Sequence, residues 1–137
     1  MAQFYPKSGS FWLAALVQAE LALSKFRLYQ DSLTPTVATT AAELVAAEAT
    51  YTGYAAEVLT TWGDPYTSPA GGAATNSPLV QFQTAAPFTV ANLIGGAWLE
   101  NAAGDVVAII PFPDMVPMGV DGDAIPLAEI LTFLSGL

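Results

Sequence analysis

The second half of the chain is a succession of short apolar runs, each closed by turn-forming residues. The clearest pair is residues 90–101 and 105–112, which flank the sequence Ala-Ala-Gly-Asp. Gly104 in that sequence can take the positive φ that a tight turn requires, so the two runs predict a β-hairpin. Residues 106–110 are apolar at every position, which is typical of a central strand with both faces covered. This pattern constrains the fold more than any other feature of the sequence.

Further runs of the same kind occur along the chain. Residues 115–118 and 124–134 predict a last strand pair around the turn Val-Asp-Gly-Asp, and residues 67–78 predict a loop rich in Gly, Pro, Ser and Ala. About five to seven short strands separated by Gly- and Pro-containing turns are typical of a β-sandwich or a related β-rich fold. The other strand-like runs are residues 26–30, with Phe26 and Leu28 on one face, residues 51–62 and residues 79–84.

Two short helices are predicted near the N-terminus. Residues 11–24 follow a candidate cap at Ser10 and place mostly apolar side chains on one side. Thr39 or Thr40, followed by Glu43, is a capping-box pattern that opens a helix over residues 41–49.

The 137 residues are therefore expected to form one mainly β, β-sandwich-like domain. It consists of an apolar helical segment (residues 1–24) and a β-rich body (residues 25–137). The expected core of the sandwich is Val80, Phe82, Ile94, Trp98, Val107, Ile109, Ile125, Leu131 and Phe133.

The chain is poor in charge for its size. Hydrophobic residues make up 53% of it and charged residues only 11%, whereas an average globular domain carries roughly 25% charged residues. Large apolar surfaces usually mark interaction sites, so part of this surface is expected to be buried against other subunits. The alternative is a compact monomer with a surface rich in Thr, Ala and Gly.

The few charges are distributed unevenly. Lys7, Lys25 and Arg27 are the only basic residues, and eleven of the twelve acidic residues lie between Leu28 and the C-terminus. Nucleic acids and anionic membranes are poor partners for such a chain, because both require clusters of Lys and Arg. The asymmetry permits a head-to-tail contact, in which the basic N-terminal segment of one copy meets an acidic face of the next.

Catalytic chemistry has little support. The sequence contains no histidine and no cysteine, which removes the usual general base and the commonest metal ligand, and with them thiolate chemistry. No phosphate-binding or serine-nucleophile motif occurs. Glu43, Glu48 and Glu57 are available as paired carboxylates for glycoside hydrolysis, but nothing in the sequence groups them. The chain is expected to be non-enzymatic and to need no cofactor.

Asp114, Asp121 and Asp123 come nearest to a cation site. Calcium takes about six to eight oxygen ligands, and Asp-Gly-Asp lacks the spaced acids and the terminal glutamate of an EF-hand loop. A glycine flanked by aspartates is more often a tight turn. The turn is therefore preferred, and no metal is predicted.

Exposed aromatic and apolar side chains are the natural anchors of a subunit interface, where Trp and Tyr supply much of the binding energy. The alternative is a sugar-stacking platform, so a glycan is a conceivable partner; its members would be Trp12, Tyr54, Trp62, Tyr66, Phe88 and Trp98. The predicted interface residues, basic ones included, are Phe11, Trp12, Leu16, Lys25, Arg27, Trp62, Tyr66 and Trp98.

The apolar stretch of residues 11–19 is too short to cross a membrane, which takes roughly 20 apolar residues. With a single lysine before it, it is also a poor signal peptide. A soluble or assembled protein is expected.

Several short motifs resemble a class of small phage and viral-metagenome proteins described as structural or of unknown role. The similarity begins at Arg27-Leu-Tyr-Gln and Leu33-Thr-Pro-Thr, and continues through Thr39-Thr-Ala-Ala-Glu-Leu and Glu48-Ala-Thr-Tyr-Thr-Gly-Tyr-Ala. It extends to the hairpin that begins at Ile94, where Gly-Gly-Ala replaces bulkier aromatics, and to Gly122-Asp123.

The resemblance implies a virion protein, either a capsid decoration protein or a head or tail component, and transfers no catalytic residue. By analogy with three-fold positions in viral lattices, it suggests a homotrimer that contacts other virion proteins. Two alternatives remain open. One is a carbohydrate- or receptor-binding module on a virion or cell surface, and the other is a fibre or filament subunit connected by its N-terminal segment.

Overall fold

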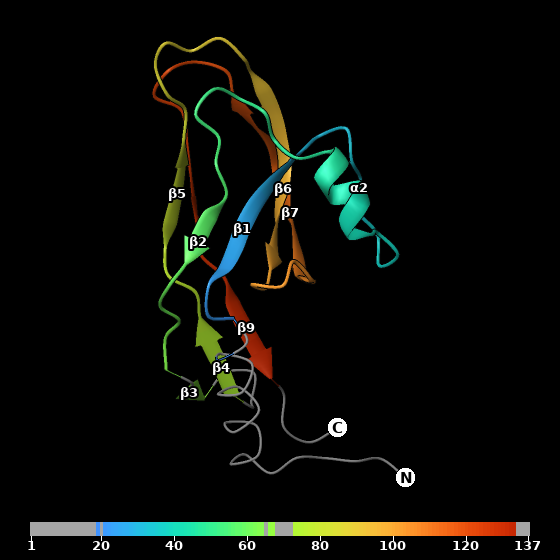
Figure 1. Ribbon diagram of the computed structural model, residues 1–137, viewed down its shortest axis with the longest axis vertical. Helices are drawn as coiled ribbons and strands as arrows, with labels where there is room; N and C mark the ends of the chain where they lie inside the picture. Colours follow the sequence, from blue (N-terminus) through green and yellow to red (C-terminus); the bar gives the residue numbers. More distant parts are fainter. Residues whose placement is uncertain (1–18, 20, 65, 68–72, 134–137) are drawn as a thin grey trace.

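The structure is a computed structural model that describes residues 19, 21–64, 66–67 and 73–133. This part of the chain is mainly β and forms a single β-sandwich-like domain of antiparallel sheets with one small helix, which confirms the predicted fold class. Figure 1 shows the arrangement. The elements are β1 (Ser24–Gln30), α2 (Ala41–Ala46), β2 (Glu57–Leu59), β3 (Tyr66–Thr67), β4 (Ala73–Asn76), β5 (Val80–Gln83), β6 (Asn92–Glu100), β7 (Val106–Met118), β8 (Ala124–Leu127) and β9 (Ile130–Phe133).

The main layer is a four-stranded antiparallel sheet with the order β2-β1-β6-β7. The predicted hairpin supplies two of its strands, β6 and β7, and Gly104 in the connecting turn has a φ of 91°. β1 lies in the middle of the sheet, where Phe26 is opposite Leu99 and Leu28 is opposite Ala97. The hairpin and the strand that pairs with it therefore form where the sequence predicts them.

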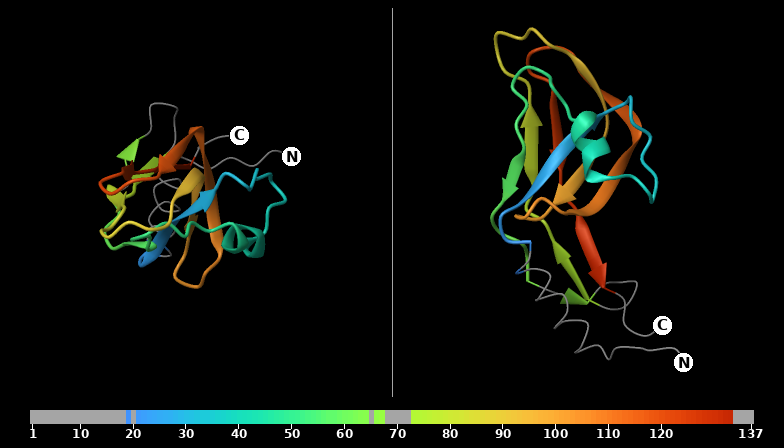
Figure 2. Two further views of the ribbon diagram at one scale, coloured as in Figure 1. Left: turned by 90° about the horizontal axis from the view of Figure 1, so that it is seen from above. Right: turned by 45° about the vertical axis from the view of Figure 1, so that its right-hand side comes forward.

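The second layer is the two-stranded sheet of β5 and β8, which lies across from β1 and β6 (Figures 1 and 2). Phe82 and Ile125, a cross-strand pair in this sheet, are buried against Phe26, Leu28 and other residues of the main layer. Apolar burial of this kind stabilises a fold by roughly 25 cal/mol per Å² removed from water. A third sheet, of three strands in the order β3-β4-β9, lies beyond one end of the two layers.

The helix α2 covers the other face of the main sheet (Figure 2). Leu44 and Ala47 form a second buried cluster with Tyr29 and Trp98. Thr40, the second of the two predicted caps, accepts a hydrogen bond from the Glu43 backbone N–H at 3.2 Å. The helix ends three residues earlier than predicted, because the chain enters an isolated bridge between Glu48 and Tyr29.

The prediction that residues 106–110 form a covered central strand is wrong. They belong to β7, which lies at the edge of the main sheet, and the side chain of Val107 is 41% exposed. The proline content of β7 explains the difference, since Pro111, Pro113 and Pro117 have no N–H and cannot complete the hydrogen-bond ladders that a central strand forms with two neighbours.

The pairing of the C-terminal strands also differs from the prediction. β8 pairs with β5, and not with the run at residues 115–118, which is the end of β7. The run at residues 124–134 is divided into β8 and β9, and β9 pairs with β4. β4 lies within the loop predicted over residues 67–78, and β3 overlaps the start of that loop. β3 has only two residues and β4 has mostly small side chains, so neither shows a clear apolar alternation. Of residues 51–62, only β2 is a strand.

The helix predicted over residues 11–24 lies largely outside the described residues. At its end the prediction is wrong, because residues 21–23 form a turn and Ser24 already belongs to β1. Of the predicted core, Phe82, Ile94, Trp98 and Ile125 are buried, and Val80 and Ile109 are partly buried. Val107 is instead exposed at the sheet edge, and the side chains of Leu131 and Phe133 lie outside the described set.

Candidate functional site

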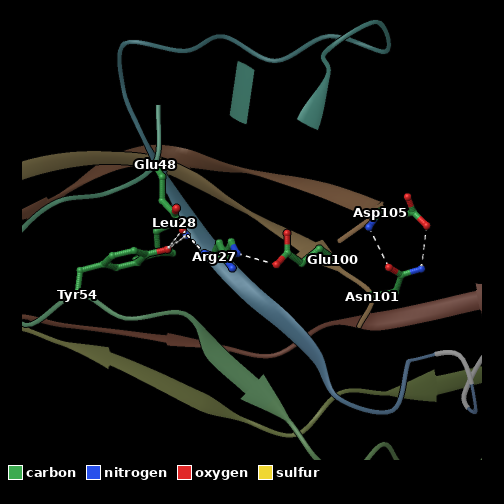
Figure 3. A network of polar contacts seen from close by, with 7 residues as sticks. All are labelled: Arg27, Leu28, Glu48, Tyr54, Glu100, Asn101 and Asp105. Atoms are coloured by element: carbon green, nitrogen blue, oxygen red, sulfur yellow. Dashed lines mark hydrogen bonds and ion pairs between the residues drawn. The ribbon is translucent and has the colours of Figure 1, made fainter. Parts of the chain in front are cut away.

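Two features of the described surface have the chemistry of a functional site. The first is a polar network around Arg27 in β1 (Figure 3). The guanidinium donates from Nε to Glu100 at 2.7 Å and from a terminal nitrogen to Glu48 at 2.8 Å. The Tyr54 hydroxyl donates to the same Glu48 carboxylate at 2.7 Å and accepts from the Leu28 backbone N–H at 3.1 Å.

The network shifts the pKa values of Arg27 and Tyr54. Burial alone lowers the pKa of Arg27, but the hydrogen bonds and charges of Glu48 and Glu100 outweigh it and raise that pKa above its usual value. Burial raises the pKa of the Tyr54 hydroxyl, and the hydrogen bond to Glu48 adds to the rise. Both carboxylates bind the one guanidinium, so the network ties the loop after α2, where Glu48 lies, to the main sheet.

The second feature is the outer edge of β7. Within the described residues this edge pairs with no strand, because β7 is the last strand of its sheet. Pro111 lies opposite Gly96 and Val116 lies opposite Ile94, so the four residues between them bulge out across from Gly95. An unpaired strand edge is a template for association with another chain.

Two apolar grooves flank this edge. One, of about 370 Å³, is lined by Phe112, Pro113, Asp114, Val116, Ala124, Ile125 and Pro126, and thus lies between β7 and β8. The other, of about 570 Å³, lies between the first half of β7 and the loop before α2. Val37 and Val107 both line this second groove and are both exposed. β7 thus lies between two grooves and carries two exposed large apolar side chains, Val107 and Met115.

The structure places the predicted interface residues in three groups. Trp62 and Trp98 are 6% and 1% exposed, so they belong to the core of the subunit and their rings are not available to a partner or to a sugar. Arg27 is paired internally, Lys25 beside it is half-buried, and Tyr66 donates to Asn76 at 2.9 Å. Phe11, Trp12 and Leu16 lie outside the described residues.

The carboxylates considered for a metal or for hydrolysis have local structural roles. Asp123 accepts from the backbone N–H groups of Gly119 and Val120 and so closes the turn before β8. No group of three or more acidic side chains that could hold a metal occurs in the described part of the chain. Glu43 lies in the first turn of α2, where its carboxylate accepts from the hydroxyl of the cap Thr40 at 3.3 Å, and Glu48 binds Arg27.

Sequence reasoning did not single out the residues along β7. The signal was present in the alternating prolines at 111, 113 and 117, which are incompatible with a central strand and typical of a protected edge. Nor did it pair Arg27 with Glu48 and Glu100, which lie 21 and 73 positions away in the sequence. Only the fold brings these residues together.

Among the described residues, no helix is long and apolar enough to cross a membrane. Comparison of the chain with protein-family models, with curated proteins and with solved structures found no match. The similarity to small viral structural proteins therefore depends on the sequence motifs alone.

Proposed function

We propose that this chain is a non-enzymatic structural subunit that works by packing against other protein subunits through the edge of β7. The observation that carries the proposal is the position of β7, a 13-residue strand at the sheet edge with an apolar groove on each side. Association through such an edge removes apolar surface from water and can pair the free backbone groups of the strand.

The charges of the chain support the same function. Arg27 is neutralised internally, and no basic residue follows it in the sequence. The surface around β7 therefore presents apolar and acidic side chains, which favours a protein partner over nucleic acid. The absence of histidine and cysteine from the sequence agrees with a role without catalysis.

The motifs shared with small viral structural proteins make a virion the proposed setting, as a capsid decoration protein or a head or tail component. A fibre subunit is a variant of the same proposal, since it also acts by packing. A carbohydrate-binding module has less support, because Trp62 and Trp98 are buried. No specific observation favours it.

Size-exclusion chromatography with light scattering tests the proposal on the purified chain. We expect a mass that is a multiple of the 14.2 kDa monomer. Met115→Lys, which places a charge on the exposed part of β7 between the groove residues Asp114 and Val116, should shift the mass towards the monomer. Val58→Lys is the matched control, because Val58 is similarly exposed on β2 at the opposite edge of the sheet. Equal behaviour of the two variants would contradict a role of the β7 edge.

A further inference from the structure

The groove between β7 and β8 lies between the two layers of the sandwich, where these two strands belong to different sheets and do not pair. Ile125, a core residue that is 5% exposed, lines it together with Phe112 and Val116. Asp114 is the only charged residue among those that line the groove, and Asp121 and Asp123 follow in the next turn. A volume of about 370 Å³ is near the lower end of the range for binding pockets, about 300–1,000 Å³, so it suits a few large side chains. An occupant should therefore be apolar and carry a positive charge at one end.

The chain itself contains a segment of this chemistry. Phe11-Trp-Leu-Ala-Ala-Leu-Val is entirely apolar, Lys7 precedes it, and the first acidic residue of the sequence is Glu20. These residues lie before the first described residue, Ala19. A stretch of 18 extended residues spans up to about 60 Å, which is enough to reach a neighbouring subunit.

We propose that the segment Phe11–Val17 of one copy docks in the β7–β8 groove of a second copy, with Lys7 beside Asp114. The inference rests on the proposed function and specifies its partner as a second copy of this chain. Phe11 and Trp12 supply the aromatic anchors that dominate such contacts. The contact joins two different surfaces of the subunit, so repetition closes a ring or extends a filament.

The geometry of β1 favours a second copy over the subunit's own segment. Leu21 is buried in the turn before β1, where the Ser24 N–H donates to its carbonyl at 2.9 Å. The groove lies at the other end of the sheet, because Val116 is opposite Ile94 and Ile94 is opposite Gln30. The six steps from Ser24 to Gln30 span about 20 Å, whereas Val17 can lie at most about 14 Å from Leu21. Within one subunit the C-terminal half of the segment cannot reach the groove.

The charge distribution selects this groove over the larger one. The groove beside residues 35–39 has no charged residue in its lining, whereas Asp114 gives the β7–β8 groove the sign opposite to that of Lys7. Opposite charges at the rim fix the orientation of a docked segment and speed the encounter.

A charge-swap experiment on the full-length chain tests the proposal by sedimentation equilibrium. Asp114 is exposed and outside the core, so Asp114→Lys should fold, which circular dichroism verifies. Turning an attraction into a repulsion should raise the dissociation constant of the oligomer about tenfold. The double variant Lys7→Asp with Asp114→Lys should restore most of the affinity. Asp64→Lys, the same change at an exposed site away from the groove, is the control and should have no effect.

A photo-crosslinking residue at position 12 tests the location of the contact independently. In a mixture of isotopically heavy and light chains, we expect crosslinks between copies to peptides that contain residues 112–116 or 124–126. Crosslinks confined to one chain, or an oligomer that Asp114→Lys weakens no more than Asp64→Lys does, would overturn this inference while leaving the proposed function intact. A monomer at every concentration would overturn both.

Discussion

Tyr29 lies over Gly96, in the space that a side chain at position 96 would occupy. A β-carbon on Gly96 would meet the phenol group of Tyr29 and would lie 2.5 Å from the carbonyl oxygen of Ile110. Glycine normally weakens the interior of a strand, and its presence there marks a close approach. Here the absence of a side chain at position 96 leaves room for the buried Tyr29 ring, which packs in the cluster that contains Leu44 of α2. The glycine pair in β6 is thus part of the packing of the second cluster.

Gly96→Ala should therefore destabilise the domain by about 2–3 kcal/mol, because the added methyl group overpacks a site that backbone atoms enclose. Urea unfolding followed by tryptophan fluorescence measures the change. Gly119→Ala is the control, since a β-carbon there meets nothing within 4 Å and the backbone φ is not positive. A loss of stability no larger than that of Gly119→Ala would show that Tyr29 does not need the space.

Tyr51 and Tyr54 form a matched pair, because their rings are in edge contact at 5.4 Å but their hydroxyl groups differ. The Tyr54 hydroxyl has two hydrogen bonds, and that of Tyr51 is buried without a partner among the described residues. Tyr54→Phe should cost about 1.5–3 kcal/mol, because it removes a bond to a charged group. Tyr51→Phe should be neutral or stabilising. Thermal unfolding of the two variants checks the order, and the reverse order would contradict the network described here.

The buried tyrosines predict sensitivity to alkaline pH. Burial, together with the charge of Glu57, raises the pKa of Tyr51 to about 12, whereas an exposed tyrosine in the unfolded chain titrates near 10. Between these values the unfolded state has lost a proton that the folded state keeps, so stability should fall as pH rises from about 10 to 12, by up to about 1.4 kcal/mol per pH unit for this group. Below pH 10 the ionisation of Tyr51 should have no effect on the free energy of unfolding.

Urea unfolding at a series of pH values tests this expectation, and tyrosinate absorbance reports the ionisation directly. Tyr51→Phe should flatten the alkaline slope. An unchanged slope in the variant would assign the alkaline loss of stability to other groups.

Arg27 and Lys25 are both basic residues on β1, but their side chains differ in their contacts. Arg27 bridges two carboxylates from different nitrogens of one guanidinium, a geometry that lysine cannot reproduce. Arg27→Lys should cost about 1–2 kcal/mol, which is below the cost of breaking a fully buried pair because this side chain is partly exposed. Lys25→Arg should be nearly neutral. Chemical unfolding at low and high salt measures both, and equal effects of the two substitutions would contradict the bridge.

Local signals were sufficient to predict the elements that depend on local chemistry. The β6–β7 hairpin follows from a glycine that can take positive φ between two apolar runs, and α2 follows from the Thr40 and Glu43 capping box. Mainly β structure follows from the repeated turns. These features require only neighbours in the sequence.

Features that depend on distant partners were missed or misread. Five consecutive apolar residues in β7 favour a covered strand by pattern, but the prolines beyond them place it at the edge. β4 has small side chains and becomes a strand because it pairs with β9, more than 50 residues later. The sequence is equally compatible with Trp98 as an interface anchor and as a core residue. Only the packing of α2 over it shows that it belongs to the core.

The central claim, that the chain works by packing against other subunits, is tested most directly by sedimentation velocity of the purified protein over a wide concentration range. We expect a boundary that moves faster than a 14.2 kDa monomer and whose sedimentation coefficient increases with concentration. A single monomeric boundary at every concentration would contradict it.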